Sequence, residues 1–341
     1  MERLRRWFLE VKRDLPWRHG ATPYGVWVSE VMLQQTQVAV VIPYYTRWMA
    51  AFPTVEALAA APIEAVIKQW EGLGYYQRAR SLHAGAKYVT EQWNGQLPAE
   101  GTLLLSIPGM GPYTVGAILN FAFHQRAPLV DGNVVRVVSR YYGVEGEVER
   151  APVRRRIWEL TETLLPQHEP WVVAEGLMEL GAMVCTPQPR CTACPLAASC
   201  VALASGDPSR LPLRRPRPQV ERLYRAVALI RSPAGVLVRR GESGQLMADL
   251  YQFPWLQTGP AGVEASEQGR WLTDQLGLEG SVTGELAPVW HTFTRYRVQL
   301  RARLFAAAER PVKGHQWVAQ RELTQLPFCS GHRRLLKQVT S

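Results

Sequence analysis

The chain has few cysteines and no long apolar run. No stretch of the 341-residue sequence approaches the roughly 20 consecutive apolar residues of a membrane-spanning helix. The stretch Met1–Arg13 is charged and amphipathic, so we expect no signal peptide. A chain without such a signal is expected in the reducing cytoplasm, where its five cysteines would not form disulfides.

Four of the five cysteines lie within sixteen residues of one another. Gaps of five, two and five residues separate Cys185, Cys191, Cys194 and Cys200, and three prolines stiffen the connecting loops. Four thiolates at this spacing suit zinc or an iron-sulfur cluster, whereas free buried cysteines usually scatter through a core. The sequence therefore predicts a metal site. Cys329 lies outside this group and is interpreted as an unpaired thiol.

Acidic residues are few relative to basic ones. Lys and Arg number 39 against 29 for Asp and Glu, which gives a formal net charge of +10 at pH 7. This balance favours an anionic partner such as a phosphate backbone over a small neutral ligand. The length and the 47% hydrophobic content favour two hydrophobic cores over one.

The clearest boundary is residues 205–222, where prolines alternate with arginines. This composition is typical of a stiff, extended, basic linker. Before it, apolar residues recur at helical spacing, as in 54–70 and 151–165. We therefore predict a mainly α first domain over residues 1–204, which includes the cysteine segment.

After the linker the pattern changes to that of strands. Basic or polar residues and apolar residues alternate strictly over 295–304, as in a half-buried strand. Residues 225–230 and 235–239 read as a strand pair around a tight turn, and 266–276 reads as a helix. The second domain, 223–341, is therefore predicted to be α+β.

Two glycines mark a tight connection between apolar helical runs. Residues 107–113 read Ile-Pro-Gly-Met-Gly-Pro-Tyr, and the backbone N–H groups of such a hairpin are able to hold a DNA phosphate. A plain connection between two helices would use the same glycines. Asp131 lies where a later helix begins, and capping that helix is its simplest role. A helix N-terminus would also keep Asp131 ionised, as a carboxylate that stabilises or traps a cation requires.

Glu30 lies on a helical segment whose neighbouring positions on the same face are mostly apolar. These are Val26, Trp27, Leu33 and Gln34. Desolvation there should raise the pKa of Glu30, which suits a general acid near neutral pH. In isolation, a half-buried glutamate paired with Gln34 or an arginine is an equally good interpretation. One protonated and one ionised carboxyl group together match the division of labour used to break a glycosidic bond.

Five motifs carry a resemblance to a known family. In chain order they are Ser-Glu-Val-Met-Leu-Gln-Gln-Thr-Gln at 29–37, Gly-Leu-Gly-Tyr-Tyr at 72–76, the Pro-Gly-Met-Gly hairpin, Val-Asp-Gly-Asn at 130–133, and the cysteine group. The set resembles the adenine DNA glycosylase (MutY) family of the helix-hairpin-helix glycosylase superfamily, whose members add a C-terminal Nudix-like domain. The resemblance implies a [4Fe-4S] cluster at the four cysteines. Zinc stays an alternative, because the first gap is one residue shorter than the family's six.

The resemblance implies that the chain is a monofunctional enzyme of base excision repair. Its substrate would be double-stranded DNA with adenine mispaired with 8-oxoguanine or guanine, bound by a monomer associated with the nucleoid. Glu30 would protonate adenine N7 and Asp131 would face the oxocarbenium-like sugar, with Tyr113 and Asn133 in support. The adenine pocket would be formed by Arg13, Trp17, Arg18, Leu33 and Glu175.

A second set of residues would contact the lesion and the DNA. It comprises Gln35, Thr36, Leu73, Tyr75, Gly109, Gly111, Phe293 and Thr294. Extruding a base costs a few kcal/mol, so a wedge is needed, and Gln35 and Tyr75 match the family's inserting residues. Without the other motifs, the two adjacent tyrosines would be read as ordinary packing at a helix start. Arg295 stands where the family usually has histidine, which shifts recognition toward phosphate attraction.

Two alternative functions compete with this prediction. Endonuclease III, which acts on oxidised pyrimidines, has a lysine where this chain has Tyr113, and without that amine no Schiff base is expected. A non-catalytic DNA-binding module is the other alternative. It has no use for both Glu30 and Asp131 in a DNA-facing cleft, because each would repel phosphate.

The Nudix resemblance is not expected to bring hydrolase activity. Nudix hydrolases hold magnesium with a cluster of glutamates on one helix. Here Arg270 is kept, but Trp271, Asp274 and Gln275 occupy the positions of the glutamates. We therefore expect this domain to recognise 8-oxoguanine without hydrolysing a pyrophosphate.

Overall fold

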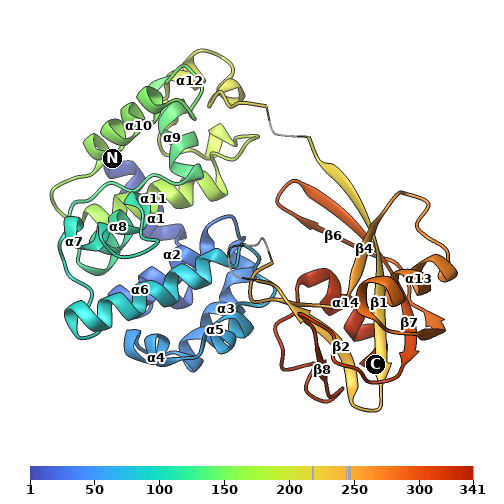
Figure 1. Ribbon diagram of the computed structural model, residues 1–341. Coiled ribbons are helices and arrows are strands. Elements are labelled where there is room, and N and C mark those ends of the chain that lie inside the picture. Colours follow the sequence, from blue (N-terminus) through green and yellow to red (C-terminus); the bar gives the residue numbers. More distant parts are fainter. Residues whose placement is uncertain (217–218, 243, 245–246, 341) are drawn as a thin grey trace. The chain divides into compact units, whose positions relative to one another are not determined.

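Figure 1 shows the computed structural model, which describes residues 1–216, 219–242, 244 and 247–340. The chain forms two compact units. The first unit comprises Met1–Ala61 and Gln77–Pro216, and the second unit comprises Pro62–Tyr76 and Arg217–Ser341. Among the described residues no helix combines the length and the apolar character needed to cross a membrane.

The first unit is mainly helical, as predicted. Its α-helices are α1 (Glu2–Val11), α2 (Pro23–Leu33), α3 (Val38–Ala51), α4 (Val55–Ala60), α6 (Gln77–Trp93), α7 (Gly101–Leu105), α8 (Pro112–Ala117), α9 (Gly132–Tyr142), α10 (Ala151–Leu164), α11 (Pro170–Met183) and α12 (Val201–Ala204). A π-helical turn, η2 (Ile118–Ala122), continues α8. Short 3-10 turns are η1 (Pro16–Arg18), η3 (Cys191–Ala193), η4 (Ala197–Ser199) and η5 (Pro208–Arg210).

The predicted helical run 54–70 is two helices. Helix α4 ends at Ala60, and α5 (Ile63–Trp70) begins after Pro62. Ala61 has φ −68° and ψ 142°, the extended backbone that a residue before proline prefers. The break is therefore local in origin, and it directs α5 into the second unit.

Helix α2 lies at the centre of the first unit. Its start is fixed by Thr22, whose hydroxyl accepts from the N–H of Gly25 at 3.0 Å, and by Pro23 in the first turn. Every residue from Tyr24 to Met32 is buried, including Glu30 at 3% exposure. A helix buried on all sides must be apolar nearly all round, so a carboxyl group in it is costly and needs a specific partner.

Helix α11 is fixed against two other helices by close contacts at small residues. A Cβ at Gly176 would lie 3.3 Å from Leu4 Cγ on α1, and one at Gly181 would lie 2.6 Å from Asn133 Cβ on α9. A larger side chain at Gly181 would force α9 and α11 apart. Buried side chains from α1, α9, α10 and α11 form a continuous core that includes Leu4, Val138, Leu160 and Leu177.

The first part of the predicted linker packs on the first unit. Leu211 is buried, and its carbonyl accepts from Arg140 Nε at 2.8 Å. Arg210 pairs with Glu145, and Arg215 Nε lies 3.2 Å from a Glu147 oxygen. The sequence predicts an extended spacer here, but up to residue 216 the segment packs on the first unit through these contacts. Arg217 and Pro218 lie outside the described residues.

The second unit is built on a mixed sheet. Its described strands are β1 (Glu221–Ser232), β2 (Gly235–Arg240), β3 (Tyr251–Gln252), β4 (Trp255–Thr258), β5 (Gly280–Glu285), β6 (Val289–Phe293), β7 (Tyr296–Ala307) and β8 (Gln316–Val318). The central order is β3-β2-β1-β7-β5, with β4 on β1, β6 on β7 and β8 on β2. Strands β1 and β7 run parallel, while β1 and β2 form the predicted antiparallel pair.

Helices cover both faces of this sheet, because β1 is apolar on both sides. Val227 and Leu229 lie in one core with Leu335 of α14 (Ser330–Thr340), and Ala228 and Ile230 lie in another with Leu272 of α13 (Ala265–Leu276). The predicted helix at 266–276 and the half-buried strand at 295–304 are confirmed. The fold class, mainly α followed by α+β, is likewise confirmed.

Residues from early in the chain complete the second unit. Glu71, just after α5, accepts from Arg333 Nε of α14 at 2.6 Å and from Arg333 Nη2 at 3.0 Å. The backbone N–H of Phe328 donates to the same carboxylate at 3.2 Å, and Lys68 Nζ donates to it at 2.8 Å. The Glu71 and Arg333 side chains are 13% and 17% exposed. The predicted domains 1–204 and 223–341, with a linker at 205–222, follow one another along the chain, whereas residues 62–76 pack in the second unit. The domain boundaries therefore stay a prediction.

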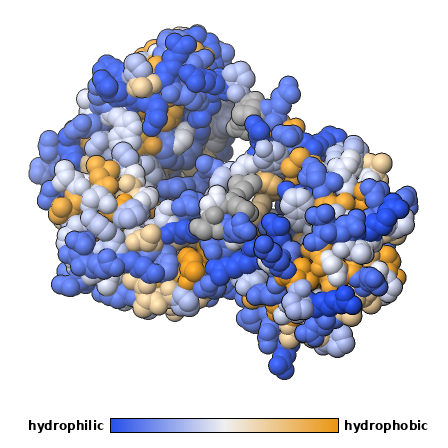
Figure 2. Space-filling view, viewed as in Figure 1, coloured by the Kyte–Doolittle hydropathy of each residue, from blue (hydrophilic) through white to orange (hydrophobic). Residues whose placement is uncertain are grey.

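The surface shows little sign of a broad apolar contact area on the face in view. Figure 2 shows this face as mostly hydrophilic, with hydrophobic residues in small separate groups. Scattered apolar residues of this kind are ordinary on a folded surface.

Because Glu71 is the acceptor for several largely buried donors, Glu71→Gln should destabilise the second unit by about 2–4 kcal/mol. Chemical denaturation followed by tryptophan fluorescence would measure the free energy of unfolding. The matched control is Glu285→Gln, because Glu285 also pairs with an arginine, Arg303, but is 64% exposed. That variant should change stability by less than about 1 kcal/mol. Equal losses in the two variants would contradict a special role for Glu71.

Candidate active site

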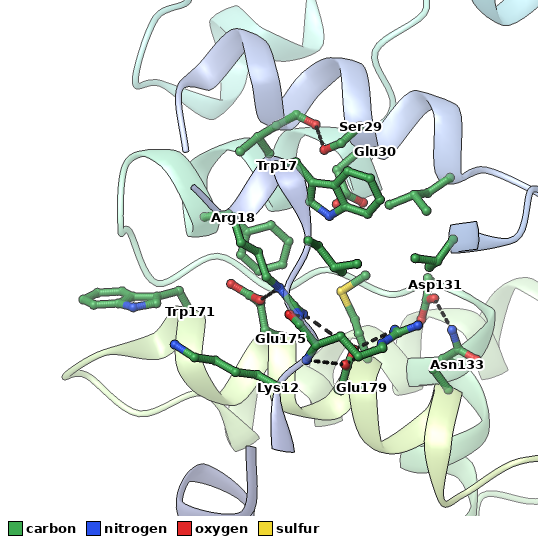
Figure 3. A pocket seen from close by; sticks show the side chains of 18 of the residues that line it. Lys12, Trp17, Arg18, Ser29, Glu30, Asp131, Asn133, Trp171, Glu175 and Glu179 are labelled. Carbon is green, nitrogen blue, oxygen red and sulfur yellow. Dashed lines mark hydrogen bonds and ion pairs between the residues drawn. The ribbon is translucent and has the colours of Figure 1, made fainter. Parts of the chain in front are cut away.

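One large cavity of about 1080 Å³ opens in the first unit between α2, α9 and α11. Figure 3 shows side chains from these helices and from the segment before α2 pointing into it. The cavity brings together most of the residues predicted for catalysis, for the adenine pocket and for contact with the lesion. They are Glu30, Asp131, Tyr113, Asn133, Arg13, Trp17, Arg18, Leu33, Glu175, Gln35 and Thr36.

Glu30 projects from the middle of α2 to the cavity wall. Its carboxylate accepts a short hydrogen bond from the hydroxyl of Tyr113 at the start of α8. Burial raises the pKa of Glu30 to about 7, and the negative charges of Asp131 and Glu175 act in the same direction. The Tyr113 hydrogen bond and Arg18 oppose the rise. A group with this pKa is able to deliver a proton near neutral pH, as the sequence predicts.

Asp131 is the N-cap of α9. Its Oδ1 accepts from the N–H of Val134 at 2.7 Å, and its Oδ2 accepts from Asn133 Nδ2 at 2.9 Å. The predicted cap is therefore present. Burial nevertheless raises the pKa of Asp131, while the hydrogen bonds and Arg136 lower it. The helix N-terminus thus opposes the effect of burial without outweighing it. The ionised form is the one to which these donors bind.

Charged side chains opposite Glu30 form a continuous network. Arg18 Nε lies 2.6 Å from Glu175 Oε2, and Arg18 Nη1 donates to the carbonyl of Arg13 at 2.7 Å. Arg13 forms a two-pronged pair with Glu179, with Nε 2.6 Å from Oε1 and Nη2 2.8 Å from Oε2. Burial raises the pKa of Glu175, whereas Arg13 and Arg18 hold the pKa of Glu179 below its usual range.

Trp17 closes one side of the cavity. It is buried, and its ring meets Tyr45 edge to face at 5.5 Å between centroids. Leu33 lies on the cavity lining at the end of α2. Both therefore line the cavity, and their role as walls of an adenine pocket stays a prediction.

The hairpin glycines lie along a second depression of the first unit. Gly109 and Gly111 line it together with Arg154, Arg155 and Arg214. Gly109 has φ +78°, and a Cβ there would lie 2.3 Å from Ser81 Cβ, so the turn requires glycine. Three arginines on the same depression give this surface the charge that a phosphate backbone needs.

Several residues predicted to touch the lesion have unusual backbone geometry. Gln35, Tyr75 and Thr294 have φ of +59°, +48° and +48°, in the left-handed region that non-glycine residues rarely adopt. Gln35 belongs to the first unit, while Tyr75 and Thr294 belong to the second, together with Leu73 and Phe293. Tyr75 is 50% exposed. Strained backbone of this kind is typical of functional loops, where the surrounding structure holds it.

The four clustered cysteines line one small pocket. Cys185, Cys191, Cys194 and Cys200 all face it, beside the buried guanidinium of Arg140. Among the described residues, however, no group of three or more His, Cys, Asp or Glu side chains has the geometry of a ready metal site. Burial raises the pKa of the Cys194 thiol to about 11. The donor set suits a thiolate-bound metal, because Arg140 supplies a cation close to the sulfurs.

Three charged residues of this region were not predicted from the sequence. Arg78 of α6 donates to the carbonyls of Val31 and Met32 at 2.8 and 3.0 Å and so caps the end of α2. Arg136 of α9 joins Asn133 Oδ1 at 2.8 Å to the carbonyl of Cys185 at 2.6 Å. Glu179 is the third. Its spacing of four residues from Glu175 on one helix was the available signal.

Two protein families match separate parts of the chain. The HhH-GPD superfamily of base excision DNA repair proteins matches residues 28–163, and a NUDIX domain matches residues 226–338. The first match covers α2 to α10, which carry Glu30 and Asp131. The second match covers the mixed sheet and both of its helices.

Individual relatives carry the comparison further. Adenine DNA glycosylase of Mus musculus is 34% identical to this chain, over 95% of this chain and 73% of its own length. Adenine DNA glycosylase of Homo sapiens is 45% identical, over 60% of this chain and 41% of its own length. Among solved structures, a thermostable thymine-DNA glycosylase aligns with a TM-score of 0.55 and 30% identity over 60% of this chain and 94% of its own. With a relative of this identity matched over nearly the whole chain, the protein belongs to the adenine DNA glycosylase family.

Proposed function

We propose that this adenine DNA glycosylase excises adenine mispaired with 8-oxoguanine or guanine, with Glu30 as the general acid and Asp131 as the group that stabilises the sugar cation. The observation that supports this most is the pair of carboxyl groups in one cavity with different surroundings. Glu30 is buried in an apolar helix, whereas Asp131 holds the donors of a helix start. That difference keeps one group able to give a proton and the other able to meet positive charge.

Each step then has a residue of this chain to perform it. The proton on Glu30 passes to adenine N7, so that the base departs as a neutral group while the N-glycosidic bond breaks. Positive charge develops on the sugar, and the Asp131 carboxylate stabilises or traps it. Water from the solvent then adds to the sugar carbon, which completes the hydrolysis. Tyr113 orients Glu30 through its hydrogen bond, and Asn133 orients Asp131. The Arg18 and Glu175 pair would contact the base edge, and Trp17 and Leu33, which line the same cavity, would form walls of the pocket.

Recognition of the duplex is assigned to residues with suitable backbone and charge. Gln35 and Tyr75 would enter the helical stack, with Thr36 and Leu73 beside them, because extrusion of the adenine leaves space that must be filled. The hairpin with Gly109 and Gly111 would bind a phosphate. In the second unit, Phe293 and Thr294 lie at the turn from β6 to β7 and would sense 8-oxoguanine. The adjacent Arg295 has a side chain that is 57% exposed and lies 3.7 Å from a Glu221 oxygen, and it would exchange this exposed pair for a phosphate.

A [4Fe-4S] cluster is the cofactor we propose at the cysteine pocket. Cys185, Cys191, Cys194 and Cys200 would hold it, and its role would be to pin the loops between them. Zinc is the alternative for the same donors. Arg140 supports either, since it lies 3.5 Å from the Cys185 sulfur and also donates to the carbonyls of Thr186 and Pro187.

The function is tested by single-turnover excision on three duplexes, each analysed with and without alkali. Adenine opposite 8-oxoguanine and adenine opposite guanine should lose the base, and strand breaks should appear only after alkali, because no lysine occupies the Tyr113 position. The third duplex carries thymine glycol opposite adenine. Its cleavage without alkali would favour an endonuclease III activity, and no excision on any duplex would favour the DNA-binding module.

Glu30→Gln should reduce adenine excision by at least about 100-fold while the affinity for the mispaired duplex is retained, because glutamine has no proton to give. In the parent the rate should fall as the pH rises above about 7, since the protonated form is lost as the pH passes through the pKa of Glu30. Quench-flow excision across this pH range, with binding measured by fluorescence anisotropy, provides both quantities. Excision by Glu30→Gln at the parent rate would refute the general-acid role.

The purified chain should contain iron and acid-labile sulfide, and Cys194→Ser should lower both. Colorimetric assays for the two elements, together with the visible absorption of the protein, measure the content. Cys329→Ser is the matched control, because Cys329 is buried in the second unit and should leave the content unchanged. Zinc in place of iron would contradict the proposed cluster but keep the metal site.

A further inference from the structure

Glu179 is a carboxylate that the proposed mechanism does not use, although it lies beside the adenine pocket. It follows Glu175 by one turn of α11, so both side chains lie on the face of the helix that lines the cavity. The Glu179 side chain is 2% exposed, against 20% for Glu175. A carboxylate buried to this extent needs opposite charge and hydrogen bonds to remain ionised.

Two arginines from the segment before α2 supply that charge. Arg13 binds both Glu179 oxygens with its guanidinium, at 2.6 and 2.8 Å, and donates its backbone N–H to Oε1 at 3.2 Å. Arg18 Nη2 lies 3.5 Å from the second oxygen. A guanidinium held at two points has little freedom to rotate. Glu179 therefore fixes the segment before α2 against α11.

Arg18 is shared between the two glutamates. Figure 3 shows it between Glu175 and Glu179, which both come from α11. Its Nε lies 2.6 Å from Glu175, and it also donates to the Arg13 carbonyl. Within this group two guanidinium groups and two carboxylates alternate, so their formal charges cancel, and Lys12 is a further cation that acts on Glu175. Loss of the Glu179 carboxylate would leave Arg13 and Arg18 with Glu175 as the one remaining carboxylate of this group, next to the proposed general acid Glu30.

We propose that Glu179 is a positioning residue for adenine recognition: it holds Arg13 and Arg18 so that Arg18 presents Glu175 to the base and the charge around Glu30 stays balanced. The inference rests on the proposed function, because it assigns a task to the residue behind the adenine pocket. Glu179 itself touches neither base nor sugar in this scheme.

Because the proposal concerns the charge near Glu30, it predicts a change in the pH dependence of excision that a loss of stability alone would not cause. The charged and titratable groups facing Glu30 are Tyr113 from α8, Asp131 from the start of α9, Glu175 from α11 and Arg18 from η1. Arg18 lowers the pKa of Glu30 and Glu175 raises it. If Glu179 is neutral, Arg18, which lowers the pKa of Glu30, loses one of its two carboxylate partners, so we expect the pKa of Glu30 to fall. Glu30 is then deprotonated at a lower pH, and the alkaline fall of the excision rate moves to lower pH.

Glu179→Gln tests this in single-turnover excision of adenine opposite 8-oxoguanine, from about pH 5.5 to 9. We expect excision about 10 to 100-fold slower, because a misplaced Arg18 and Glu175 misalign the base. We also expect an alkaline limb that is shifted to lower pH. Glu179→Asp keeps the charge at a shorter reach, so it should slow excision without moving the limb. Glu162→Gln is the control, because Glu162 pairs with Arg126 but is 53% exposed and lies outside the cavity. It should behave as the parent.

A double variant separates positioning from folding. Glu179→Gln combined with Arg13→Gln removes the uncompensated cation and should regain thermal stability, measured by calorimetry, while excision stays slow. Recovery of the parent rate by the double variant would overturn the proposal, because Glu179 would then serve only to neutralise Arg13. An unmoved pH limb in Glu179→Gln would overturn it as well. A parent chain that excises no adenine would instead overturn the proposed function, and this inference with it.

Discussion

Exclusion of water from the middle of α2 is the constraint on which the rest of the active site depends. A glutamate surrounded by Val26, Trp27 and other buried side chains is costly in its ionised form. The same cost raises the pKa of Glu30 to about 7 and makes a hydrogen bond from Tyr113 necessary. Each neighbouring element therefore has to be fixed with respect to α2. Arg78 does this at the end of α2, and Arg13 and Arg18 hold the segment before α2 on α11 through Glu179 and Glu175.

The large elements were predictable because their patterns are strong and local. The alternation over 295–304 and the helical spacing over 151–165 each come from residues close in sequence, and the structure has β7 and α10 there. Glu30 was interpreted from its own helical neighbours, and Asp131 from its place at a helix start. In both cases a single element carries enough information to indicate the surroundings of the side chain.

What the sequence did not predict depends on contacts between distant segments. Glu179 is paired with Arg13, which lies 166 residues away along the chain. Arg136 joins Asn133 to the cysteine segment only because α9 and α11 pack closely at Gly181. Likewise, the contacts that hold residues 205–216 on the first unit come from Arg140 and Glu147. No local pattern encodes such pairs, so spacing within one helix, as for Glu175 and Glu179, was the only partial signal.

The placement of residues 62–76 in the second unit has a consequence for how the molecule is assembled. The chain enters the second unit after Ala61, leaves it at Tyr76 and returns after Pro216, so the two units are interleaved along the sequence rather than joined end to end. During synthesis α5 is made long before its later partners in the second unit, which include Arg240 of β2, bound by Glu64, and the carbonyls of Thr324 and Leu326, bound by Lys68. These contacts must wait for the C-terminal part of the chain. Cutting the chain near residue 216 would therefore not yield two complete units. The C-terminal fragment would keep Arg333 but lose Glu71, and the N-terminal fragment would carry Glu71 without Arg333.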